Sequence, residues 1–156
     1  MGLDMYLIAT KHLSGGWDHA TDKEKTPHRL VCEAINITNN SLYESSGSME
    51  VSWTAAYWRT ENAIHNWFVE NCQDGVDGCQ RSYVSIEQLK QLLDICKEII
   101  NAPVMSRDSV ACEMLPTSTD IDESYYKGLH YTIKQLDKII TNPELDGCDF
   151  YYTASW

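Results

Sequence analysis

The residues best suited to hold a ligand are concentrated between Tyr57 and Asp77. Arg59 offers a guanidinium that can grip a phosphate or carboxylate with two hydrogen bonds. Asn62 could orient the same ligand, and His65 could act as a general base, because an imidazole titrates at about pH 6.5. Trp58 stands next to Arg59, and planar ligands are often held by aromatic rings and a few polar groups. The stretch therefore favours a binding site for a small, planar anion.

The same stretch predicts the helix that would position these groups, from about Glu61 to Cys72. Thr60 could cap its start, and Gly75 lies just beyond its end. Three apolar residues at helical spacing would face a core; they are Ile64, Trp67 and Phe68. Counting in threes from Arg59 places Asn62 and His65 on a side that the apolar residues leave free. We expect these three polar side chains to line one pocket.

The C-terminal segment is predicted to complete this pocket. Phe150–Trp156 is rich in aromatic residues, and chain ends are normally polar. We therefore expect Trp156 to be buried beside a sheet or a pocket. The predicted ligand-binding residues are Trp58, Arg59, Asn62, His65, Gln73, Asp77, Tyr152 and Trp156. The competing interpretation of Arg59, Asn62 and His65 is a solvated helix face, with Arg59 paired to a nearby acid.

Other chemistries have weaker support in the sequence. The five histidines lack the spacing that would place two metal ligands on one helix face. Asp74, Asp77 and Gly78 resemble a calcium loop only loosely, because the later carboxylate is missing. Cys72 or Cys79 could pair with His65, but no motif for nucleophilic catalysis is present. We predict no metal and no cofactor.

Composition narrows the partners. The formal net charge of -11 opposes binding to long nucleic acid, where a basic surface supplies most of the affinity. It is equally unfavourable for an anionic membrane surface. The six cysteines form no Cys-x-x-Cys pair, and neither a secretory signal nor a transmembrane-length segment is visible. We expect a protein in the cytoplasm of a bacterial host, with free thiols, a small-molecule partner and a second copy of the chain as a further candidate partner.

Periodicity predicts a single domain, 1–156, with a polar excursion at about 12–28 and a loop at 39–48. The predicted strands are Leu3–Thr10, Leu30–Ile37, Met49–Tyr57 and Arg81–Val84, and Asp149–Ser155 is predicted to be a last short strand or an aromatic tail. The clearest helix begins after Ser85 and ends before Pro103. Ser85 forms a capping box with Gln88 at its start. A further helix begins near Asp120 and ends before Pro143, whereas 103–119 is predicted to be irregular. The fold class is α+β, with about three helices packed on a small antiparallel or mixed sheet.

Several motifs resemble those of a family of small, uncharacterised phage- and prophage-encoded proteins. They are Met1-Gly2-Leu3-Asp4-Met5-Tyr6-Leu7, Tyr57-Trp58-Arg59 with Asn62, Ile64-His65 and Trp67-Phe68-Val69, Gln73-Asp74-Gly75 with Asp77, Leu115-Pro116-Thr117, and Phe150-Tyr151-Tyr152 with Ser155-Trp156. The resemblance covers most of the chain outside 12–48 and brings no activity with it. Family members have a Gly- and Phe-rich piece after Leu-Pro-Thr, where this chain has Ser118-Thr119-Asp120-Ile121. If that piece forms part of a pocket, the pocket is altered here.

The resemblance implies an accessory, host-directed role, and three classes of function are open. The first is a protein that sequesters a small anionic, nucleotide-derived host signal without turnover, in evasion of host defence. The second is a small hydrolase or transferase that uses His65. The third is an acidic protein that binds and inhibits a host protein. We favour the first, because the sequence contains binding residues but no recognisable catalytic set.

Overall fold

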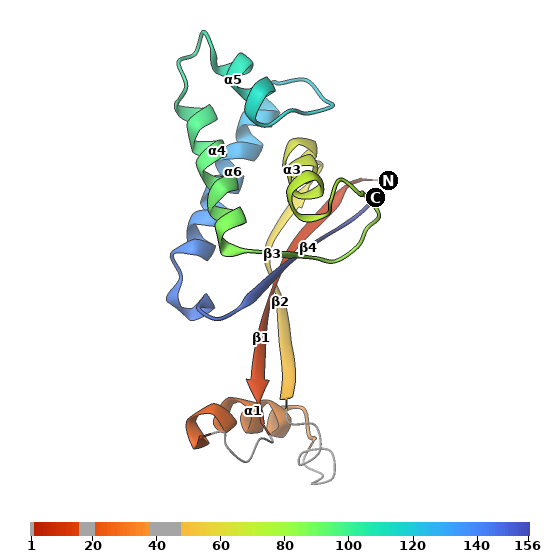
Figure 1. The fold of residues 1–156 in the computed structure, drawn as a ribbon, viewed down its shortest axis with the longest axis vertical. Coiled ribbons are helices and arrows are strands. Elements are labelled where there is room, and N and C mark those ends of the chain that lie inside the picture. The colour runs from red at the N-terminus through yellow and green to blue at the C-terminus, as the bar shows by residue number, and fades with distance from the viewer. Residues whose placement is uncertain (1, 16–20, 38–47) are drawn as a thin grey trace. The chain divides into compact units, whose positions relative to one another are not determined.

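The computed structural model describes residues 2–15, 21–37 and 48–156, and its chain divides into two compact units (Figure 1). Unit 1 comprises Met1–Ala9 and Thr54–Trp156, and unit 2 comprises Thr10–Trp53. The described residues form an α+β fold with one four-stranded antiparallel sheet and five α-helices. The fold class is therefore confirmed, with more helices than the three predicted.

The sheet has the strand order β2-β1-β4-β3. Its strands are β1 (Asp4–Ser14), β2 (Ser48–Arg59), β3 (Ser82–Val84) and β4 (Asp149–Ser155). The predicted strands at 3–10, 49–57, 81–84 and 149–155 are thus confirmed. In the register of β3 and β4, Tyr83 lies opposite Tyr151 and Val84 lies opposite Phe150. Side chains alternate between two faces, as they must in a pleated strand.

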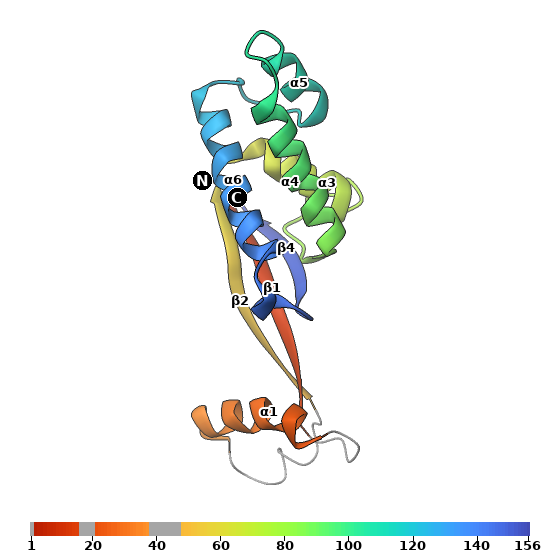
Figure 2. The same ribbon diagram turned by 90° about the vertical axis from the view of Figure 1, so that its left-hand side faces the viewer.

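One face of the sheet in unit 1 is covered by helices, as Figures 1 and 2 show. The helices of this unit are α3 (Asn62–Cys72), α4 (Ile86–Asn101), α5 (Arg107–Met114) and α6 (Glu123–Ile140), and a short 3-10 helix, η1 (Pro143–Leu145), precedes β4. The covered face includes the fully buried Met5 and Leu7 of β1. Trp58 of β2 is also buried there: its indole N–H donates to Thr132 of α6, and its ring lies 5.9 Å from that of Phe68 in α3.

Local sequence explains where the long helices begin and how they pack. The Ser85 hydroxyl accepts the backbone N–H of Gln88, and the Gln88 side-chain oxygen accepts the backbone N–H of Ser85, so the predicted capping box is confirmed. The third predicted helix begins slightly later than expected, because Asp122 rather than Asp120 caps α6. Lys97 of α4 and Asp137 of α6 form an ion pair at 2.9 Å that links the two helices.

Unit 2 contains helix α1 (Asp22–Ala34) and the neighbouring ends of β1 and β2. The hydroxyls of Thr10 and Ser52 are hydrogen-bonded at 2.8 Å, and His12 lies 3.2 Å from a carboxylate oxygen of Glu50. The carboxylate of Glu24 accepts the backbone N–H of Thr21 at the start of α1.

Two sequence expectations about local structure were wrong, at 30–37 and at 103–119. The first segment, predicted as a strand, is mainly the end of α1. The described part of the polar excursion at 12–28 consists of the end of β1 and the start of α1. The segment predicted to be irregular, 103–119, contains α5. The loop predicted at 39–48 lies outside the described residues except for Ser48, which begins β2.

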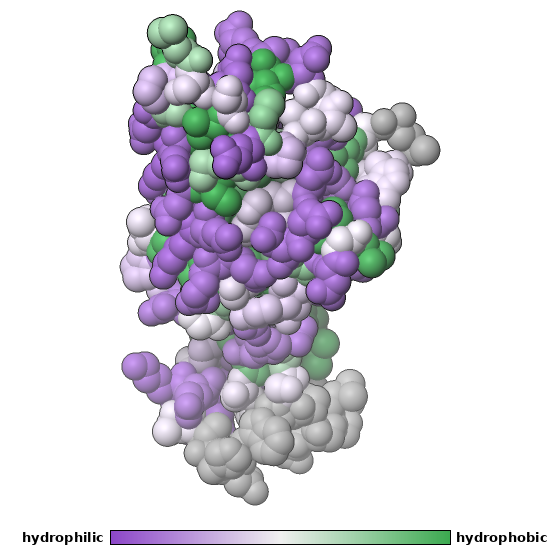
Figure 3. Space-filling view, turned by 45° about the horizontal axis from the view of Figure 1, so that its top comes forward, coloured by the Kyte–Doolittle hydropathy of each residue, from purple (hydrophilic) through white to green (hydrophobic). Residues whose placement is uncertain are grey.

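Surface character agrees with the composition. Hydrophilic residues cover most of the surface seen in Figure 3, with hydrophobic residues scattered between them. No helix among residues 2–15, 21–37 and 48–156 is long and apolar enough to cross a bilayer.

Truncation of the helix core tests this packing. Leu89 and Leu129 are buried in α4 and α6, so Leu89→Ala or Leu129→Ala should each lower the free energy of unfolding by about 2–5 kcal/mol. Val104→Ala is the matched control, because Val104 is exposed. Urea denaturation followed by circular dichroism measures the difference. A neutral Leu129→Ala variant would remove that residue from the core.

Candidate ligand-binding site

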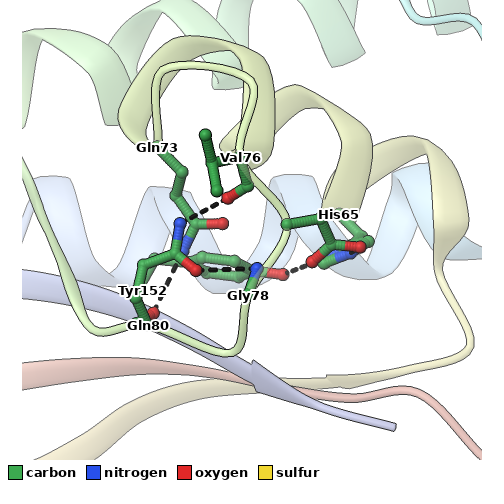
Figure 4. A network of polar contacts seen from close by, with 7 residues as sticks. His65, Gln73, Val76, Gly78, Gln80 and Tyr152 are labelled. Atoms are coloured by element: carbon green, nitrogen blue, oxygen red, sulfur yellow. Dashed lines mark hydrogen bonds and ion pairs between the residues drawn. The ribbon is translucent and has the colours of Figure 1, made fainter.

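His65 lies in a chain of polar contacts that joins α3 to the buried Tyr152 of β4 and to the exposed Asp77 in the loop after α3 (Figure 4). Its Nδ1 atom lies 2.7 Å from the Tyr152 hydroxyl, and its Nε2 atom lies 3.1 Å from a carboxylate oxygen of Asp77. The Trp156 ring meets the imidazole edge-on, with centroids 5.8 Å apart. The structure therefore brings together four predicted site residues: His65, Asp77, Tyr152 and Trp156.

The 73–80 loop that carries Asp77 is held by its own side chains. The buried Gln73 amide donates to the Gln80 carbonyl at 3.1 Å, so this predicted ligand contact supports the loop instead. The Gln80 side chain donates to the Val76 carbonyl and accepts the Gly78 N–H (Figure 4). Asp74 and Cys79 both have positive φ, and such conformations persist only where surrounding contacts determine them.

These contacts select one tautomer of the neutral His65 ring. A carboxylate can only accept, so in that tautomer Nε2–H donates to Asp77 and Nδ1 accepts the Tyr152 hydroxyl. Burial, followed by the charge of Asp77, raises the pKa of Tyr152 and keeps its hydroxyl protonated as a donor. Both nitrogens of the imidazole are engaged and the residue is 7% exposed. This geometry favours a structural role over the general-base role considered from the sequence.

The remaining predicted site residues do not join this cluster. Trp58 is only 1% exposed and packs in the core, so it cannot stack on a ligand. Arg59 is the last residue of β2 rather than part of a helix, and its guanidinium lies 4.0 Å from Asp4 at an exposed position. The expected common helix side for Arg59, Asn62 and His65 is therefore wrong. Trp156 is 47% exposed, so its predicted burial is also wrong.

The break between β2 and α3 explains the misplacement of Arg59. Thr60 has a φ of 57°, in the left-handed region that β-branched residues rarely adopt. Its N–H donates to the Leu3 carbonyl at 2.8 Å, which keeps the strand pairing up to this residue. Helix α3 then begins at Asn62 with Glu61 as its N-cap residue, so Thr60 is not the cap that we predicted.

Asn62 lines a different site, a cavity of about 360 Å³ beside the first residues of α3 and α6. Its lining is polar and includes three carboxylates but no Lys, Arg or His. The lining residues are Thr60, Glu61, Asn62, Ala63, Thr117, Thr119, Asp120, Asp122, Ser124 and Tyr125. The volume falls within the range of small-molecule sites. Of the residues predicted to bind a ligand, Asn62 alone is in this lining.

Glu61 is the distinctive group of this cavity. Burial raises the pKa of its carboxyl above the ordinary value of 4.5. Among the described residues, its carboxylate has neither a hydrogen-bond partner nor an ion pair, and it lies against Gly128 in the middle of α6. A Cβ atom at Gly128 would come within 2.0 Å of the Glu61 Oε2 atom. The glycine therefore makes room for the carboxylate.

From the sequence, Glu61 was assigned only to the start of a helix, and its place in the cavity was missed. One signal was available: Gly128 interrupts a strongly amphipathic helix, and an isolated glycine in such a pattern usually has a packing or functional reason. The partner of that glycine was not visible, because Glu61 and Gly128 are distant in the sequence and meet only in the folded chain.

The cysteines differ in burial, and burial suppresses the reactivity of two of them. All six cysteines are free, as predicted. Burial raises the pKa of the Cys72 and Cys96 thiols to about 12, which suppresses the reactive thiolate at neutral pH. Within 2–15, 21–37 and 48–156, no group of three or more His, Cys, Asp or Glu residues is arranged to hold a metal ion.

The chain matches no protein-family model, no curated protein and no solved structure.

Removal of the Tyr152 hydroxyl tests this chain of polar contacts around His65. Tyr152→Phe leaves the buried His65 Nδ1 without its donor, so the free energy of unfolding should fall by about 1–3 kcal/mol. Tyr83→Phe is the matched control, because Tyr83 is exposed. Nitrogen-15 spectra of the imidazole should show the Nε2–H form in the unmodified protein. An Nδ1–H form would contradict the assigned network.

Thiol accessibility provides a second test. At pH 8, the exposed Cys79 and Cys112 should react with Ellman's reagent well before the buried Cys96, whose thiol is held protonated. In denaturant and without reductant, all six thiols should react. Recovery of fewer than six would reveal a disulfide that contradicts the structure.

Proposed function

We propose that this protein binds a small polar ligand in the cavity beside Glu61 and holds it without chemical change. The observation that carries this proposal is the Glu61 carboxylate, which is half-buried and lacks a partner among the described residues. A desolvated carboxylate without a partner opposes folding at neutral pH. A ligand that donates hydrogen bonds to it would offset this effect.

Two further unfavourable features meet at the same place. Thr60 lines the cavity in a left-handed conformation that a β-branched side chain disfavours. Gly128 costs α6 about 1 kcal/mol relative to alanine. Local strain and unfavourable residue choices cluster at functional sites, because binding rather than stability then maintains them.

The charge of the lining defines the ligand class. Asp122 already accepts the N–H groups of Ser124 and Tyr125, so Glu61 and Asp120 are the carboxylates left to face a ligand. Together with the hydroxyls of the lining, they favour a small molecule that carries amino groups and hydroxyls. This sign is opposite to the anion predicted from Arg59, which does not line the cavity.

Sequestration fits the site better than turnover by His65. The imidazole is not part of the cavity lining, and both of its nitrogens are engaged by Tyr152 and Asp77. The resemblance to phage and prophage proteins supports a host-derived ligand. The segment in which this chain departs from that family, 118–121, contributes Thr119 and Asp120 to the cavity. The altered piece would thus adjust ligand choice.

Binding measurements test the ligand class. Titration calorimetry with a panel of aminosugars, polyamines and mono- and cyclic nucleotides should show binding of an amine-bearing member. Glu61→Gln should weaken it at least about tenfold, because hydrogen bonds to charged groups contribute about 1.5–3 kcal/mol. Glu123→Gln is the matched control: Glu123 is an exposed carboxylate of α6 paired with Lys127. Chromatography should recover the ligand unchanged.

Gly128→Ala probes the same carboxylate from the other side. The added methyl group should displace the Glu61 carboxylate and weaken ligand binding, while stabilising α6 by up to about 1 kcal/mol. Binding only of a nucleotide, with loss on Arg59→Ala, would contradict the cavity proposal. So would recovery of a processed ligand.

The stability of the ligand-free protein gives an independent check of Glu61. Its pKa is higher in the folded than in the unfolded state, so its contribution to stability is present below about pH 4.5 and is lost as pH rises through the folded pKa. Glu61→Gln should therefore be more stable than the unmodified protein at pH 7, and this difference should shrink below pH 4.5. Ligand binding should strengthen over the same rise in pH.

A further inference from the structure

The sheet of unit 1 has an outer face, opposite to the buried one, that carries four tyrosines. They alternate with buried residues along the strands: Tyr6, Tyr57, Tyr83 and Tyr151. Tyr83 is 55% exposed and Tyr57 is 37% exposed. The helices of unit 1 pack against the opposite face, as the contacts of Trp58 with α3 and α6 show. Tyrosine is enriched at the centres of protein interfaces.

The tyrosines of this outer face are held in place by neighbours. Arg81 lies over the Tyr151 ring, 4.1 Å from its centroid, and the Tyr83 ring meets Tyr151 at 5.9 Å. Toward the other edge of the same face, on β2 and β1, the Tyr57 ring lies 5.3 Å from the Tyr6 ring. The Tyr57 hydroxyl donates to Asp4, a contact that raises the pKa of Tyr57. Side chains arranged in advance lose little entropy when they bind a partner.

The charges of the face balance, unlike those of the whole chain. One half has Arg59 and Asp4, which lie 4.0 Å apart, and the other half has Arg81 and Asp149. The strand segments that build the face, 4–9, 54–59, 82–84 and 149–155, contain neither Lys nor Glu. The chain as a whole has a formal net charge of -11. A second copy is thus repelled by most of the molecule but not by this face.

We infer that the outer face of this sheet binds the same face of a second copy of the chain. A two-fold axis requires a surface that is complementary to itself. Each half of the face offers one Arg and one Asp, so charges of one copy can meet opposite charges of the other. The tyrosines supply the apolar contact between them. Two sheets packed face to face are a common arrangement in proteins.

Sedimentation equilibrium of the full chain tests this inference. The unmodified protein should show a reversible monomer–dimer equilibrium. Tyr83→Glu or Tyr57→Glu should raise the dissociation constant at least about tenfold, because each places two added charges in one interface. Val104→Glu is the matched control, because it adds the same charge at an exposed apolar residue outside the sheet. Circular dichroism verifies that each variant is folded.

Charge-reversal variants test whether the outer face of one copy binds the same face of the second copy. A variant with Arg59→Asp and Arg81→Asp and another with Asp4→Arg and Asp149→Arg should each self-associate poorly. Mixed together, they should form a heterodimer, as seen by native mass spectrometry. A protein that is monomeric at all concentrations overturns the inference, and so does a folded pair of variants that fails to associate. Binding of a single-stranded oligonucleotide, lost on Tyr83→Glu, would also overturn it by giving the face another occupant.

Discussion

The position of Glu61 in the cavity depends on the contact between Tyr152 and helix α3. The Tyr152 ring is stacked on Phe68 with centroids 4.1 Å apart, and its hydroxyl donates to His65 three residues earlier in the helix. Two contacts on one side of α3 fix both its position and its rotation about its axis. That rotation determines where Glu61, the N-cap residue of the helix, points. The place of Glu61 against α6 is therefore set by packing from the last strand of the chain.

Stability and binding are in opposition at the start of α3. The core of unit 1 is well determined: Trp58, Phe68 and Tyr152 are buried and make specific ring contacts. Glu61 and Gly128 each lower stability: Gln would remove the desolvated charge, and Ala would favour the helix once the Glu61 carboxylate had moved aside. A rigid core can tolerate such losses, and a preorganised carboxylate binds its ligand without first having to be ordered.

Much of the fold could be predicted from the sequence, because several signals agreed within each element. The helix after Ser85 combined a capping box with a regular apolar stripe, and the strands β1 and β2 combined alternation with β-branched and aromatic residues. The end of helix α1 was mistaken for a strand because 30–37 alternates only loosely and Pro27, just before it, argues against a helix. Helix α5 was missed because its apolar residues lack a clear period.

The site was harder to predict because it depends on backbone geometry and on distant partners. The pairing of Asp77 with His65 requires the 73–80 loop to turn back, with Asp74 and Cys79 in left-handed conformations. These conformations could not be predicted from the sequence. Arg59 was wrongly placed on the same helix face as Asn62, because β2 ends at Arg59, Thr60 breaks the chain direction and α3 begins only at Asn62. A single sequence likewise could not pair Glu61 with Gly128.

The net charge of -11 does not describe the local charge at either proposed binding surface. Exposed charges interact only over a Debye length of about 8 Å at physiological salt, so distant acids influence neither the cavity nor the outer face of the sheet strongly. Within the cavity, burial strengthens the influence of Glu61 on a ligand. On the outer face, Arg59 and Arg81 are balanced by Asp4 and Asp149, so apolar contact between tyrosines meets little repulsion. Our two proposals therefore rest on separate surfaces: the cavity at the starts of α3 and α6 for a small amine-bearing ligand, and the outer face of the sheet for a second copy of the chain.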